Sequence, residues 1–97
     1  MINASREHIK LIRDTIKQRF AGAEVRVFGS RVNGKSKKYS DIDLAIVEKR
    51  KISLKHLNEL RDAFQESDIP YRVDIQDWRR VSREFKAVIN KKYAILK

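Results

Sequence analysis

One stretch, between residues 24 and 44, constrains most strongly what this chain can fold into. It starts as a short apolar strand pattern, passes directly into Gly29 and Ser30, continues as a polar loop and ends in a second strand pattern that carries Asp41 and Asp43. Because strand side chains alternate between two faces, the two aspartates should point the same way, about 6.6 Å apart. Like charges so placed repel unless a cation lies between them, and Mg²⁺ is the usual cation where carboxylates face phosphates. The stretch predicts a nucleotide site, with a loop for phosphates beside a carboxylate pair for metal.

Residues 29–36 also fit G-x-x-x-x-G-K-[ST], the pattern of a P-loop, but their context excludes that interpretation. A P-loop opens a long helix whose N-terminus holds the phosphates. Here residues 37–40 are all that separates Ser36 from the next strand pattern, whereas a βαβ crossover needs a dozen or more residues. An EF-hand is excluded too, because Ala45 and Ile46 stand where its next ligand and its glycine belong.

Apolar spacing divides the rest of the chain into helices and strands. We expect helices at 5–20, 53–66 and 82–96, with serine caps, and strands at 24–28, 41–48 and 71–76. The second strand should turn one apolar face to the core and its aspartates to the other. The buried stripes of the helices should be Ile9, Ile12, Ile16 and Phe20, then Leu54, Leu57, Leu60 and Phe64, then Phe85, Val88, Ile89, Tyr93 and Leu96. The order predicts an α+β fold, a sheet of at least three strands with helices packed on its apolar face.

A third acid, Asp74, lies in the last expected strand between apolar neighbours. If that strand pairs with the Asp41–Asp43 strand, a same-face neighbour is about 4.8 Å away. Three such carboxylates suit two Mg²⁺ ions ~4 Å apart, which clamp the attacking and leaving oxygens of a phosphoryl displacement. The alternative is that these acids simply lie on the solvent-exposed face of an edge strand. All three together, after a strand–Gly–Ser turn, favour the metal site.

Composition sets the broad class. The chain has 97 residues, 41% of them hydrophobic and 37% charged, which suits one domain over 1–97. It has no cysteine, no apolar run near the ~20 residues of a membrane span and no apolar signal region, so we expect a cytoplasmic protein without a membrane contact. The net charge of +10 favours anionic partners, but nothing matches a nucleic-acid module, which leaves direct nucleic-acid binding open.

The motifs resemble the minimal nucleotidyltransferases of the DNA polymerase β-like superfamily. That superfamily is marked by Gly-Ser, a short helical loop, Asp-x-Asp on the next strand and a third acid on a later strand, which here correspond to Gly29, Ser30, Asp41, Asp43 and Asp74. The resemblance covers nearly the whole chain and implies the polymerase β-like fold, a mixed sheet with helices. It implies that Gly29 and Ser30 bind the triphosphate of ATP or another NTP. It also implies that the three aspartates are catalytic and hold two Mg²⁺ ions, with Mn²⁺ as the alternative.

Arg31, which follows in the same loop, is a candidate for neutralising the triphosphate, and pairing with an acid is an equal alternative. Stand-alone members of the family resemble one half of a two-part system, whose other half is a separately encoded helical protein of the HEPN type, often an RNase toxin. The resemblance therefore implies a metal-dependent nucleotidyltransferase that moves a nucleotidyl group, expected to be AMP, to its partner and so acts as antitoxin. The alternative is a non-catalytic antitoxin that neutralises the toxin by occlusion.

Overall fold

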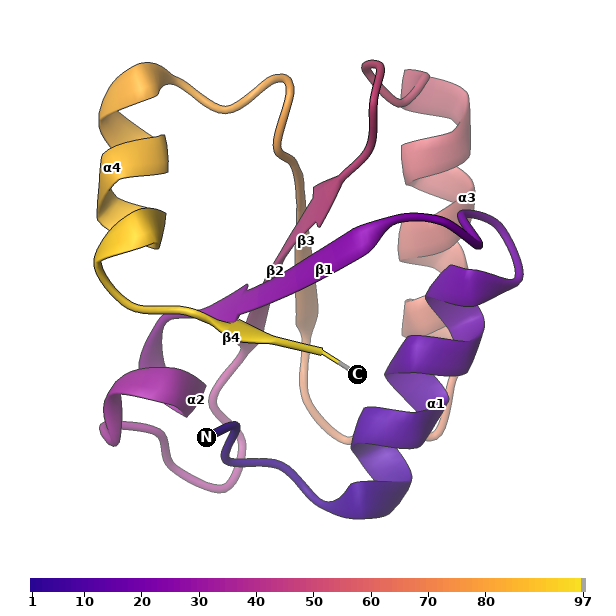
Figure 1. The fold of residues 1–97 in the computed structure, drawn as a ribbon. Helices are drawn as coiled ribbons and strands as arrows, with labels where there is room; N and C mark the ends of the chain where they lie inside the picture. Colours follow the sequence, from indigo (N-terminus) through magenta and orange to yellow (C-terminus); the bar gives the residue numbers. More distant parts are fainter. Residues whose placement is uncertain (97) are drawn as a thin grey trace.

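The computed structural model describes residues 1–96, which form a mixed sheet with helices against both of its faces (Figure 1). In chain order the elements are α1 Arg6–Lys17, β1 Glu24–Phe28, α2 Ser30–Asn33, β2 Ile42–Val47, α3 Leu54–Gln65, β3 Val73–Asp77, α4 Arg83–Lys91 and β4 Ala94–Ile95. The predicted α+β class is confirmed, but the prediction that the helices pack on one face of the sheet holds for α1 and α3 and not for α4 (Figure 1). Within these residues no helix is both long and apolar enough to cross a membrane.

The three long helices begin where the sequence predicts. In each, the hydroxyl of the capping serine accepts a hydrogen bond of 3.1 Å from a main-chain N–H three residues on: Ser5 from His8, Ser53 from His56 and Ser82 from Phe85. Such a bond satisfies one of the first four N–H groups of a helix, which have no partner inside it.

The sheet has the strand order β3-β2-β1-β4. Strand β1 runs antiparallel to β2 and to β4, whereas β2 and β3 are parallel. The register places Leu44 beside Ile75 and, one residue earlier, Asp43 beside Asp74. Leu44 and Ile75 are fully buried and the two acids are not, so the predicted division into an apolar and a polar face is confirmed.

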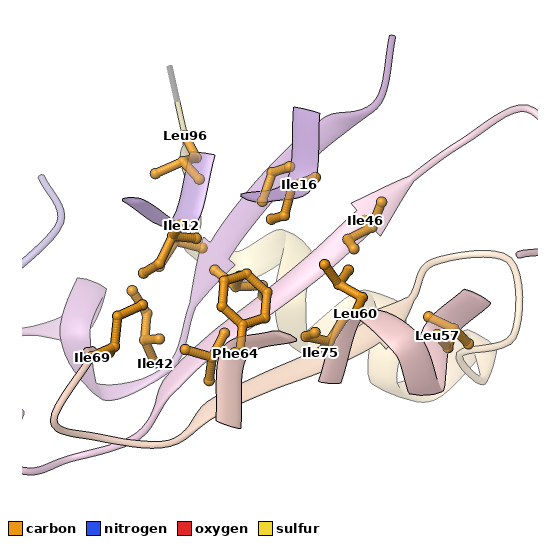
Figure 2. Packing of buried hydrophobic residues seen from close by; sticks show 14 of the residues in the cluster. Ile12, Ile16, Ile42, Ile46, Leu57, Leu60, Phe64, Ile69, Ile75 and Leu96 are labelled. Carbon is orange, nitrogen blue, oxygen red and sulfur yellow. The ribbon is translucent and has the colours of Figure 1, made fainter. Parts of the chain in front are cut away.

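Helices α1 and α3 lie together against the apolar face (Figure 1). Their buried side chains meet those of β1, β2 and β3 in the main core, where Ile12, Ile16, Leu60 and Phe64 face Ile42, Ile46 and Ile75 (Figure 2). Leu54 was expected in this core, but 59% of it is exposed. Helix α3 begins at Leu54, and its core contacts start one turn later at Leu57.

The C-terminal segment differs most from its prediction. A helix over 82–96 was expected, but α4 ends at Lys91, because Lys92 is extended (φ −160°, ψ 115°). The chain then forms β4 along the open edge of β1, and the N–H of Leu96 donates to the carbonyl of Val25 at 2.9 Å. This pairing satisfies main-chain N–H and C=O groups of β1 that would stay unpaired if α4 continued as a longer helix.

Helix α4 covers part of the second face of the sheet, opposite α1 and α3 (Figure 1). Its one buried residue, Ile89, packs with Phe28 and Ala45 in a small second cluster. The predicted stripe of this helix is therefore split, since Leu96 joins the main core instead. Its other members are partly exposed: Phe85 by 37%, Val88 by 55% and Tyr93 by 37%.

Candidate active site

Three aspartates gather on the second face of the sheet, at the end not covered by Ile89. Asp43 in β2 stands beside Asp74 in β3, and Asp41 lies one residue before β2. Burial, followed by the charges of Asp74 and Asp41, raises the pKa of Asp43 from 3.8 to about 6. Asp43 is therefore half-buried beside two further carboxylates, a setting in which a bound cation would stabilise its ionised form.

The turn after β1 brings the main chain against Asp43. Gly29 has φ +77° and ψ −154°, a conformation that side chains other than glycine rarely adopt. A Cβ on Gly29 would overlap the Oδ2 atom of Asp43 and lie 3.1 Å from its Cγ. Ser30 follows as the first residue of α2, a helix of four residues and therefore not that of a P-loop. The predicted Gly–Ser turn and the predicted acids are thus neighbours in space.

Arg72 belongs to this site, although no sequence motif singled it out. Its guanidinium lies 3.9 Å from Asp41 and 3.5 Å from Asp74, and it lowers the pKa of Asp43. Its side chain is 70% exposed, so these contacts with two acids are solvent-screened. The available signal was its position two residues before Asp74, which puts both on one side of an extended chain.

The three aspartates suit a hard divalent cation by their chemistry. They offer carboxylate oxygens, the ligands that Mg²⁺ and Mn²⁺ prefer, and the pKa of Asp43 is raised first by burial and then by the charges of Asp74 and Asp41. In residues 1–96 no three acidic, histidine or cysteine side chains already surround one point as metal ligands. Asp41 and Asp74 are turned toward Arg72 instead, so their side chains would have to rotate to bind metal.

Arg31 has surroundings that neither alternative for it anticipated. It is buried (5% exposed), and its guanidinium donates four hydrogen bonds of 2.8–3.0 Å to the carbonyls of Asn3, Lys38 and Ser40. It also lies 3.8 Å above the ring of Tyr71. No acid pairs with Arg31 among the ion pairs of the described residues. The side chain ties the loop before Asp41 to the chain start, and its part in nucleotide binding stays a prediction.

The profile of the family described as "Polymerase beta, Nucleotidyltransferase" matches residues 10–97. The chain belongs to this family. A relative from Haemophilus influenzae (strain ATCC 51907 / DSM 11121 / KW20 / Rd), described as a probable protein adenylyltransferase MntA, supports the assignment. It is 40% identical to this nucleotidyltransferase over 90 residues, which are 93% of this chain and 79% of the relative.

Solved structures support the nucleotidyltransferase fold. A mutant of the toxin–antitoxin MntA-HpeT superposes with a TM-score of 0.78 at 19% identity, over 92% of this chain and 72% of the other. A toxin–antitoxin with AMP-PNP gives 0.79 at 20% identity, over 96% and 73%. At such identities the superpositions establish the shared fold.

Proposed function

We propose that this nucleotidyltransferase transfers AMP from ATP, with Mg²⁺, to a hydroxyl group of a separately encoded helical partner of the HEPN type, and that it thereby acts as antitoxin. The observation that carries the proposal is the pairing of Asp43 with Asp74 in register, directly beside the Gly29 turn. Support also comes from the adenylyltransferase relative and from the toxin–antitoxin structures of similar fold, one of them with AMP-PNP.

Each part of the site has a role in this reaction. Gly29 lets the main chain approach the triphosphate, and the Ser30 hydroxyl donates to a phosphate oxygen. Asp41, Asp43 and Asp74 would hold the divalent ions, which neutralise charge on the triphosphate and on the attacking oxygen. The acceptor oxygen bonds to the α-phosphorus while the bond from that phosphorus to the bridging oxygen breaks, and pyrophosphate leaves. The hydroxyl proton passes to the Asp74 carboxylate or to water.

Calorimetry with ATP tests the nucleotide site. We expect binding in the presence of Mg²⁺, and weak binding in excess EDTA or in Asp43→Asn, because the acids need a cation before they can face phosphates. Equal affinity with and without EDTA would contradict the proposal.

A transfer assay tests catalysis and separates it from neutralisation by occlusion. With α-labelled ATP and the partner encoded beside this chain, Asp74→Asn should keep the fold, as seen by circular dichroism, and lose about 10²–10³ in rate. Wild-type turnover by that variant would show that Asp74 is a surface acid. A partner that is neutralised without becoming labelled would establish occlusion instead.

A further inference from the structure

A cavity of about 570 Å³ opens at the free edge of β3, next to the carboxylates. The second half of α3 and the segment leading into β3 form its walls, which include Arg61, Phe64, Gln65, Arg72 and Asp74. Asp74 thus belongs to both the acid cluster and this cavity. The nucleotide site described above gives the cavity no role.

The groups of the site follow one another across the sheet. Gly29, at the end of β1, contacts Asp43 in β2; Asp43 stands beside Asp74 in β3; and Asp74 borders the cavity. In an in-line displacement, the attacking and leaving oxygens lie on opposite sides of the phosphorus. If pyrophosphate leaves on the Gly29 side, the attacking hydroxyl has to arrive from the Asp74 side, where the cavity opens.

We propose that this cavity binds the acceptor segment of the partner protein, and that it selects a hydroxyl-bearing side chain with acidic residues around it. The proposal rests on the proposed function and adds a second substrate site to it. The transfer is the reaction written above: the acceptor oxygen bonds to the α-phosphorus, and pyrophosphate departs toward Gly29.

Two guanidinium groups of the cavity, against the one carboxylate of Asp74, favour an acidic segment. Arg61 is held at the edge of the sheet, where it donates to the carbonyl of Ile75 at 3.2 Å and to Asn58 at 3.2 Å. Arg72 adds a second guanidinium, whose contacts with Asp41 and Asp74 are long and exposed. The chain as a whole carries a net charge of +10, which attracts the same kind of partner.

The apolar part of the cavity favours a peptide over RNA. Pro70 is exposed and Tyr71 is half-buried among its lining residues, and both offer non-polar surface to the non-polar part of a side chain. Binding of single-stranded RNA relies on exposed aromatic rings on which bases stack. Of the two rings here, Phe64 is buried, and the guanidinium of Arg31 lies 3.8 Å from the centre of the Tyr71 ring.

Gln65 allows a clean test, because it lines the cavity, is exposed and makes none of the hydrogen bonds given above. The variants are Gln65→Glu, Gln65→Lys and the cavity-filling Gln65→Trp, with Gln18→Glu at the exposed end of α1 as the matched control. The acceptor probes are a random glutamate–tyrosine copolymer and a single-stranded RNA oligonucleotide, labelled from α-labelled ATP with Mg²⁺. Calorimetry with Mg²⁺ and ATP is run on every variant.

We expect the wild type to label the copolymer in preference to the RNA. Gln65→Glu should lower kcat/KM for the copolymer about five- to tenfold at low salt, and Gln65→Lys should raise it, since a charge at this rim acts on the acidic chain directly. Gln65→Trp should lower it at least as much, whereas Gln18→Glu should match the wild type. The affinity for ATP should stay unchanged in all four.

Three results would overturn the inference while the proposed function stands: ATP binding without labelling of the copolymer, preferential labelling of RNA, or Gln65 variants that behave like Gln18→Glu. Failure of the wild type to bind ATP with Mg²⁺ would overturn the proposed function itself.

Discussion

Two constraints at the turn position 29 exclude every residue except glycine. Its φ is +77°, and a Cβ would overlap Asp43. Gly29→Ala should therefore cost about 1–3 kcal/mol of unfolding free energy and weaken ATP binding at least tenfold, because Asp43 has to move. Urea unfolding and calorimetry measure the two effects. Gly22→Ala is the control, since nothing lies within 4 Å of its Cβ position. Similar losses in both variants would contradict the role given to Gly29.

The buried side chain of Arg31 should contribute strongly to the stability of the fold. Arg31→Met removes four hydrogen bonds to carbonyls, which should lower the unfolding free energy by roughly 2–4 kcal/mol and loosen the loop before Asp41. Arg31→Lys should fall in between, and Arg19→Met, at an exposed position, should change little. Chemical denaturation measures this. Full stability with loss of ATP binding would instead favour a direct contact between Arg31 and the triphosphate.

The raised pKa of Asp43 leads to a prediction of how the stability of the metal-free protein depends on pH. Its pKa is about 6 in the folded protein against 3.8 ordinarily, so the folded state holds this proton more tightly than the unfolded chain. The ionised Asp43 carboxylate lowers the free energy of unfolding. This effect is complete above about pH 6 and fades as the pH falls toward 3.8. Between pH 7.5 and pH 5 in EDTA, the Tm of the wild type should therefore rise relative to that of Asp43→Asn. Parallel Tm curves for the two proteins would refute the shift.

At the scale of elements, local patterns predicted what depends on local sequence. Serine caps and apolar spacing located α1 and α3, and alternation separated Leu44 from Asp43. The pairing of β4 with β1 was missed because Tyr93 and Leu96 also fit a helical spacing. Its partner strand lies far away in the sequence, with Arg26 opposite Ile95, so no local pattern near residue 95 indicates the pairing. The hydrogen bonds of Arg31 were not predicted for a similar reason, since its acceptors include the carbonyl of distant Asn3.

Helix α4 should be held to the sheet mainly by Ile89. Ile89 is fully buried against Phe28 and Ala45, whereas Val88, its neighbour in the same helix, is 55% exposed. Ile89→Ala should lower the unfolding free energy by about 2–4 kcal/mol, through lost burial and the cavity left behind. Val88→Ala should stay within about 0.5 kcal/mol. Equal effects in urea unfolding would mean that α4 does not dock through Ile89.

At the scale of the whole molecule, we expect a transferase of this size to work with a partner. In the proposed site the Gly29 turn and the three aspartates bind the nucleotide, and the cavity beside Asp74 is left for an acceptor from another protein. Apolar side chains stay exposed on and after α4, among them Phe85, Val88 and Tyr93. We therefore expect a stable complex with the product of the neighbouring gene, burying more than ~1,000 Å² in total.

Co-expression and size-exclusion chromatography test this complex, and its salt dependence tests the part played by charge. Raising the salt from 0.1 M to 1 M shortens the screening length from ~10 Å to ~3 Å, so a protein of net charge +10 should associate with an acidic partner at least about tenfold more slowly.

Val88→Asp should weaken the complex, and Leu54→Asp, at a site 59% exposed on α3, is the matched control. A chain that elutes alone, and that transfers nucleotide just as fast to a small-molecule acceptor, would show that no partner is needed.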